Sequence, residues 1–303
     1  MKRIIKIVSS ICLSIVLVAS IQLVVTASGN NMNSVGDEII YSEFDMYWKM
    51  KNTDREVLLR QGNSEELVDW VKSNSYEEEL YRRSQLPTEI LEFYGYSDEE
   101  INLLRDYGGE VLTPESPLAE ASAICTGNST VNSIDFNTTN IKYEFHWNKC
   151  PVYKGNDAMG LAWSTANQDG GSLACTITNK FAYVTYTCID KPDVISVYDV
   201  DDQNSFTYGF TKFPVYYTVI DGIVREYWAK EGVMLIGLQK RTSSGSTAGF
   251  GSIEIIGGYG HSTGGGQIGI SVGISGSGVS LSLSFTPTSS VETLALSKVY
   301  RQY

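Results

Sequence analysis

The sequence predicts a mainly β protein: an antiparallel β-sandwich or barrel preceded by a small acidic α-helical domain. Two observations support this prediction. From residue 124 onward, β-branched, aromatic and glycine residues alternate in roughly ten to fourteen short runs, and no crossover helix separates the runs. Before residue 113, capping residues and helical periodicity mark about four or five short helices.

Residues 1–27 have the pattern of a signal peptide. Lys2 and Arg3 open the chain, a long apolar run follows, and small residues at 25–27 suit cleavage. We therefore expect a secreted or extracellular-surface protein whose mature chain starts near Ser28. The apolar run is long for a signal peptide, so a retained membrane anchor stays open as an alternative.

Residues 28–112 form the predicted helical domain, and they hold most of the negative charge. Residues 37–120 contain 21 Asp and Glu against 8 Lys and Arg, out of a formal net charge of −12 for the chain. Without a basic stripe, the chain lacks the electrostatic means to bind nucleic acid or an anionic membrane surface. The sequence does not identify a partner, and it leaves a membrane and an extracellular polymer as the two alternatives.

Helix signals can be placed along this domain. Periodicity predicts a helix over Asp37–Gln61, and a shorter one follows Asn63. Two pairs of Ser and Glu, each three residues apart, predict capping boxes: Ser75 with Glu78 and Ser97 with Glu100. Pro87 marks the start of a helix, and Gly95 marks its end. Residues 113–123 read as a linker, which also suits proteolytic removal of the helical domain as a prosegment. The all-β domain then covers 124–303.

Within the β domain, turn residues and period-two alternation separate the strands. The pattern predicts individual strands at Ser172–Asn179, Phe181–Cys188, Ile223–Ala229 and Val233–Lys240. The pair Asp221-Gly222 predicts a two-residue hairpin turn.

The stretch from Gln267 to Phe285 predicts a hairpin with two different faces. Apolar residues alternate strictly with Gly or Ser, so they share one face: Ile268, Ile270, Val272, Ile274, Val279, Leu281, Leu283 and Phe285. Such a hairpin either packs its apolar face inside the fold or inserts into a membrane. Transmembrane strands need about 9–11 residues, and these runs are somewhat shorter.

Four cysteines follow the signal segment: Cys125, Cys150, Cys175 and Cys188. An even number in an exported chain predicts two disulfides, with the pairing left open. The alternative is that all four are reduced and buried. The chain contains no C-x-x-C pair, and the cysteine spacings do not fit a zinc site. Neither a metal nor a cofactor is predicted.

Five residues are candidates for binding. Period two places His146 and Glu144 on one face of a strand, where they form either a binding or acid–base pair or a plain polar face. His261 lies in a predicted glycine-flanked loop before the hairpin. Asp199 and Asp201 belong to an acidic turn that lacks the glycine and distal glutamate of a helix–loop–helix calcium site.

No catalytic constellation is recognisable, so the sequence favours an exported, non-catalytic β-rich binding or structural module. One alternative is a secreted hydrolase of an extracellular polymer that uses carboxylates such as Glu144, Asp157 or Asp221, because paired carboxylates leave no sequence signature. The other is a membrane-active, pore-forming protein that uses the 267–285 hairpin.

Overall fold

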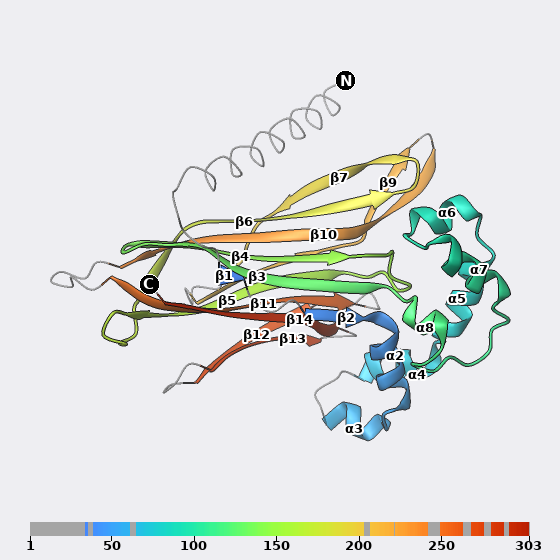
Figure 1. Ribbon diagram of the computed structural model, residues 1–303, viewed down its shortest axis with the longest axis horizontal. Coiled ribbons are helices and arrows are strands. Elements are labelled where there is room, and N and C mark those ends of the chain that lie inside the picture. The colour runs from blue at the N-terminus through green and yellow to red at the C-terminus, as the bar shows by residue number, and fades with distance from the viewer. Residues whose placement is uncertain are drawn as a thin grey trace.

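A computed structural model describes residues 34–35, 39–60, 65–202, 207–220, 222–241, 249–262, 268–275, 280–287 and 291–302. It confirms the mainly β fold. Short N-terminal helices gather at one end of an elongated assembly of antiparallel strands (Figure 1). The strands form two large sheets and a separate two-stranded hairpin.

The helical region has short helices joined by tight turns. Its elements are α2 (Glu43–Asn52), α3 (Arg55–Arg60), α4 (Glu65–Ser73), α5 (Tyr76–Ser84), α6 (Thr88–Phe93), α7 (Asp98–Asp106) and α8 (Pro117–Glu120). Their apolar sides form one buried cluster that includes Phe44, Val68 and Leu104. None of the described helices is long and apolar enough to span a bilayer.

The larger sheet has eight strands, in the order β1-β3-β4-β10-β6-β7, with β2 also pairing with β3 and β9 with β10. Its strands are β1 (Ser34–Val35), β2 (Ile39–Ser42), β3 (Ile124–Ile134), β4 (Thr138–Trp147), β6 (Cys175–Cys188), β7 (Lys191–Tyr198), β9 (Tyr216–Ile220) and β10 (Ile223–Lys240). The smaller sheet has the order β14-β11-β5-β8. Its strands are β5 (Asp157–Asn167), β8 (Tyr208–Phe213), β11 (Phe250–Ser262) and β14 (Val291–Gln302).

The two sheets pack as a sandwich around one hydrophobic core. Alternate residues of β4 point inward, so Tyr143, Phe145 and Trp147 are buried together with Trp163 of β5 and Tyr259 of β11. The Phe145 and Tyr259 rings stack across the sheets, with centroids 4.2 Å apart. The structure thus gives a sandwich rather than a barrel.

The hairpin of β12 (Ile268–Ser275) and β13 (Ser280–Pro287) forms a sheet of its own. Among the described residues, no strand pairing links it to either large sheet. β13 runs close to β5, β11 and β14, below the smaller sheet in Figure 1. Val279, one of the predicted hairpin residues, lies outside the described residues.

Several element boundaries differ from the sequence prediction. The separate strands predicted on either side of residue 180 form one strand, β6, and those on either side of residue 231 form β10. A bulge between Ala229 and Glu231 lets β10 continue without a turn. The predicted helix over 37–61 is interrupted by β2 and by a break between α2 and α3. The predicted linker contains α8, whose Leu118 and Ala119 are buried.

Other local predictions are confirmed. Ser97 and Glu100 form a reciprocal capping box at the start of α7. Ser75 caps α5 by accepting the Glu78 N–H, but the reciprocal bond from the Ser75 N–H to the Glu78 side chain is not formed, so only half of this predicted box is present. Gly222 has a φ of 75° in the turn where Ile220 pairs with Ile223.

The predicted disulfides are absent, because Cys125, Cys150, Cys175 and Cys188 are all buried free thiols. Cys175 and Cys188 occupy opposite ends of a 14-residue strand, which separates them by roughly 40 Å, whereas a disulfide needs Cα atoms within about 7 Å. The Cys175 thiol instead lies 3.4 Å from the Thr165 hydroxyl. Burial is the main cause that raises the pKa of each of the four thiols.

Candidate functional site

The predicted pair His146 and Glu144 lies on the solvent-facing side of the larger sheet. The two side chains line a groove of about 330 Å³ together with Asn128, Tyr183 and Glu231. His146 Nδ1 is 3.5 Å from a carboxylate oxygen of Glu231 on the paired strand β10. Glu144 forms an ion pair of 2.8 Å with Lys142.

Acidic and polar side chains line this groove. Burial raises the pKa of Tyr183, and the carboxylates of Glu231 and Glu144 add to the shift. The Oδ1 atom of Asn128 is buried and has no hydrogen-bond partner among the described atoms. The acceptors that line the groove for a ligand with hydroxyl or ammonium groups are the carboxylates of Glu144 and Glu231.

His261 lies elsewhere. It is the penultimate residue of β11 rather than part of a loop, and only 1% of its surface is exposed. Its Nδ1 atom is 2.9 Å from Asp157 Oδ1, and its Nε2 atom is 3.1 Å from the Tyr153 carbonyl oxygen. A carbonyl oxygen only accepts, so Nε2 is the donor. The Asp157 carboxylate lies at hydrogen-bond distance from the other ring nitrogen, so both nitrogens have an oxygen partner.

Asp157 is the centre of a short chain of hydrogen bonds in the core. The Tyr259 hydroxyl donates to Asp157 Oδ2 over 2.5 Å and accepts from Trp147 Nε1 over 3.1 Å. Burial, followed by the charge of Asp157, raises the pKa of Tyr259 well above its ordinary value. Asp157 is 5% exposed, so its carboxylate is compensated inside the protein rather than by water.

The helical region is attached to the sandwich by residues 148–153, which follow β4 and which we term the clasp segment. The Cys150 N–H donates to the Tyr94 carbonyl over 2.9 Å. The buried Arg83 guanidinium donates to the Cys150 carbonyl over 2.9 Å and also to the Pro151 carbonyl. Lys149 forms an ion pair of 2.8 Å with Glu100 of α7.

Glu43, the first residue of α2, completes the attachment. Its carboxylate accepts the N–H groups of Val152 and Tyr153 over 2.8 and 2.9 Å. The side chain is 3% exposed. Burial is the largest influence on its pKa and raises it; the positive charge of His261 and the two N–H bonds act in the opposite direction.

The Tyr153 ring is enclosed by aromatic side chains of the helical region. Trp70 meets it edge-on with centroids 4.6 Å apart, and Tyr76 and Tyr47 lie at 5.8 and 6.4 Å. Neither Glu43 nor Tyr153 was predicted from the sequence to be a site residue. The one available signal was an acidic residue next to Phe44 at the start of an apolar helix face.

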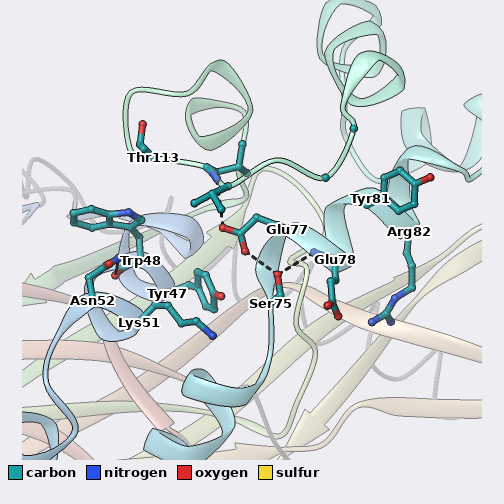
Figure 2. A pocket seen from close by; sticks show the side chains of 14 residues that line it. Tyr47, Trp48, Lys51, Asn52, Ser75, Glu77, Glu78, Tyr81, Arg82 and Thr113 are labelled. Atoms are coloured by element: carbon teal, nitrogen blue, oxygen red, sulfur yellow. Dashed lines mark hydrogen bonds between the residues drawn. The ribbon is translucent and has the colours of Figure 1, made fainter.

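A second cavity, of about 920 Å³, lies within the helical region between α2, α5 and residues 108–113. Figure 2 shows Ser75 and Glu77 near its centre, Trp48 to one side, and Tyr81 to the other. The carboxylate of Glu77 accepts the Ser75 hydroxyl and the Leu112 N–H. The cavity lining also includes the exposed side chains of Trp48, Tyr81 and Val111.

The remaining candidates are not brought together. Asp199 is exposed, and Asp201 forms a backbone bridge with Phe210. The neighbouring Asp202 forms an ion pair of 2.8 Å with Lys180. Within the described ranges, no group of three or more His, Cys, Asp or Glu residues is placed to hold a metal ion.

The carboxylates of the hydrolase alternative are also apart. Glu144 is on the outer face of the larger sheet, and Asp157 is buried in the smaller one. Asp221 lies outside the described residues.

Comparison with known proteins identified distant similarities only. No family model and no curated protein matches the chain. Among solved structures, AvmM, which catalyses macrocyclization in alchivemycin A biosynthesis, aligns with 50% of this chain and 80% of its own at 8% identity and a TM-score of 0.21. The delta-toxin of Clostridium perfringens aligns with 60% of this chain and 86% of its own at 9% identity and a TM-score of 0.24.

Proposed function

We propose that this chain is an exported, membrane-active protein that inserts the β12–β13 hairpin into a lipid bilayer. The observation that carries the proposal is the pairing register of the hairpin. Ile270 pairs with Phe285, Val272 with Leu283, and Ile274 with Leu281; between them, Gly or Ser pairs with Ser or Thr. Every apolar residue therefore falls on one face and every small polar residue on the other.

The two faces match those of a membrane-spanning hairpin, and we propose that hairpins of several copies pair edge to edge to complete the backbone pairing. In the bilayer, one face of a strand meets lipid and the other meets water, and all backbone groups must be paired. The described part of the hairpin contains no charged residue. Each described strand has eight residues, so spanning needs about one to three more, which the flanking Ser, Thr and Gly residues of the sequence can supply.

The isolation of the hairpin also supports the proposal. A strand that is hydrogen-bonded into a large sheet leaves it only by breaking the whole ladder. The described residues of β12 and β13 pair only with each other, so the hairpin can leave the sandwich with its own ladder intact.

The test uses two neighbouring positions on opposite faces. Purified protein is added to phosphatidylcholine vesicles loaded with calcein, and dye release is measured. Ile270→Asp places a charge on the apolar face, and Ser271→Asp places the same charge on the small polar face. We expect Ile270→Asp to abolish release and Ser271→Asp to retain it, because only the first buries a charge in lipid. Equal release from both variants, with circular dichroism showing both folded, would contradict the proposal.

A second candidate function, recognition of an extracellular polymer, is supported by the groove on the larger sheet, where Glu144 and Glu231 lie beside His146 and Tyr183. The measurement is retention of the protein on insoluble cellulose, chitin and xylan. We expect Glu144→Gln and Glu231→Gln to weaken retention on whichever polymer is bound. Tyr217→Ala, at an exposed ring on β9 away from the groove, serves as the control. An absence of retention on all three polymers would count against this candidate.

A further inference from the structure

The clasp segment contacts the helical region on one side and the strand that leads to the hairpin on the other. Tyr153 is bonded on both sides of its backbone. Its N–H donates to Glu43 over 2.9 Å, and its carbonyl accepts from His261 over 3.1 Å. Residues from α2, the clasp segment and β11 are thus joined through a single residue.

His261 is well placed to respond to Tyr153. Its ring is buried between Asp157 and the Tyr153 carbonyl, and the Trp147 ring packs on it at 5.2 Å. With 1% of its surface exposed, the ring relies on protein groups rather than on water for its hydrogen bonds. A buried donor left without an acceptor destabilises the arrangement that contains it.

The position of His261 in the chain places its contact with Tyr153 close to the hairpin. It is followed by Ser262, the last residue of β11, and β12 begins six residues later at Ile268. On the partner strand, His261 pairs with Glu292, near the start of β14. The last pairs of the β11–β14 ladder before the hairpin thus lie at the level of His261.

We infer that the helical region restrains the hairpin, and that the restraint runs from Glu43 through Tyr153 to His261. While the helical region is attached, the carbonyl of Tyr153 is held in place and the end of β11 is fixed. When the attachment is broken, Tyr153 loses Glu43 and its aromatic surroundings, and His261 keeps Asp157 but loses the Tyr153 carbonyl. The last pairs of the β11–β14 ladder, at the base of the hairpin, then lose that support and open more often. The inference rests on the proposed function for its biological meaning, because it concerns regulation of the same hairpin.

Hydrogen–deuterium exchange followed by mass spectrometry tests the restraint without any membrane. Glu43→Gln keeps the size of the side chain but leaves one of the two N–H groups of the clasp segment without an acceptor. We expect amide exchange in the peptides covering 268–287 to become about tenfold faster. Exchange in the central parts of β6 and β10 should not change, which excludes general loss of stability.

Glu100→Gln is the matched control. It makes the same chemical change in the same helical region and removes the ion pair to Lys149 of the clasp segment. Glu100 does not contact Tyr153, so exchange in the hairpin should stay at the wild-type level. Equal acceleration by both variants, or no acceleration by Glu43→Gln, would overturn the inference.

A double-mutant cycle with His261→Gln tests the proposed route. If Glu43 and His261 act through the same residue, the effects of the two substitutions on hairpin exchange should be clearly non-additive. Additive effects would show that they act separately. If Glu43→Gln does not fold, Trp70→Leu replaces it, since Trp70 packs on the Tyr153 ring, and Trp48→Leu becomes its control.

Vesicle leakage separates this inference from the proposed function. With both correct, Glu43→Gln releases dye faster than wild type, and Glu100→Gln does not. Accelerated exchange without leakage from any form would overturn membrane insertion and leave the restraint established. Leakage from the wild type with unchanged exchange in Glu43→Gln would overturn the restraint alone.

Discussion

The clasp segment and the β12–β13 hairpin are both short regions outside the two large sheets, but they are held in opposite ways. The clasp segment has specific polar partners in the helical region: Arg83, Glu43, Glu100 and the Tyr94 carbonyl. The described strands of the hairpin pair only with each other. Directional side-chain bonds therefore hold the clasp segment to the helical region, whereas among the described residues no strand pairing holds the hairpin to either large sheet.

The largest expected effect comes from removing the cation that holds the clasp segment. Arg83→Met leaves the Cys150 and Pro151 carbonyls and the Tyr96 hydroxyl without their buried donor. We expect the free energy of unfolding, measured by urea denaturation, to fall by about 3 kcal/mol.

The adjacent arginine is the control for this change. Arg82 is exposed and pairs with Glu79 one turn away, so Arg82→Met should lower the free energy of unfolding by less than about 1 kcal/mol. Similar losses from the two substitutions would mean that the clasp segment contributes no special stability.

The next effect concerns a close approach between the helical region and the clasp segment. Gly95 has a φ of 93°, and a Cβ atom there would lie 2.8 Å from the Asn148 carbonyl oxygen. Gly109 has nearly the same φ, 91°, but the closest atom to its Cβ would be a Tyr81 ring carbon at 3.9 Å. Both Ala substitutions incur the cost of a left-handed backbone, about 1 kcal/mol.

Only Gly95→Ala adds a steric clash, so we expect it to lower the free energy of unfolding by about 1–2 kcal/mol more than Gly109→Ala. Thermal or urea unfolding of the two variants gives this difference directly. If both lose the same stability, the clasp segment adjusts freely, and the contrast with the hairpin is weaker than the distances indicate.

The smallest effect is on the pH dependence of stability. The pKa values of Glu43 and Glu100, two acids that hold the clasp segment, are shifted in opposite directions. Burial raises the pKa of Glu43 above 4.5, so its contribution to stability is fully present below that pH and is lost as the pH rises through the raised value. The bonds from Lys149 and Ser97 outweigh burial at Glu100 and lower its pKa. Its contribution is therefore present above pH 4.5 and is lost as the pH falls through the lowered value.

The check is the pH dependence of the free energy of unfolding for wild type, Glu43→Gln and Glu100→Gln. Relative to wild type, the Glu43→Gln variant should gain stability as the pH rises, and the Glu100→Gln variant should gain stability as the pH falls. If the difference from wild type has the same pH slope in both variants, the pKa values of the two carboxylates are shifted in the same direction and the prediction is wrong.

Much of the fold was predictable because it depends on local patterns. Alternation along β4 correctly placed Tyr143, Phe145 and Trp147 inside and Glu144 and His146 outside. The Ser97 capping box is set by four consecutive residues, and it too was predicted. The hairpin register follows from the same period of two.

The rest depends on contacts between distant parts of the chain. Glu43 and Tyr153 are 110 residues apart, and nothing near either residue indicates the other. His261 was expected in a loop because glycines flank it, but those glycines lie within β11, between β5 and β14. The even cysteine count failed as a guide for the same reason, because pairing requires proximity that only the fold provides.

The four buried thiols also determine what happens after the protein opens. Folded, each cysteine is shielded and kept largely protonated, so alkylating reagents and oxidants react with it slowly. Unfolded in an oxidising medium, the same thiols are free to form disulfides that the native sandwich does not contain. Unfolding would then become irreversible, and the rate at which the thiols are labelled under reducing conditions would report how often each part of the sandwich opens.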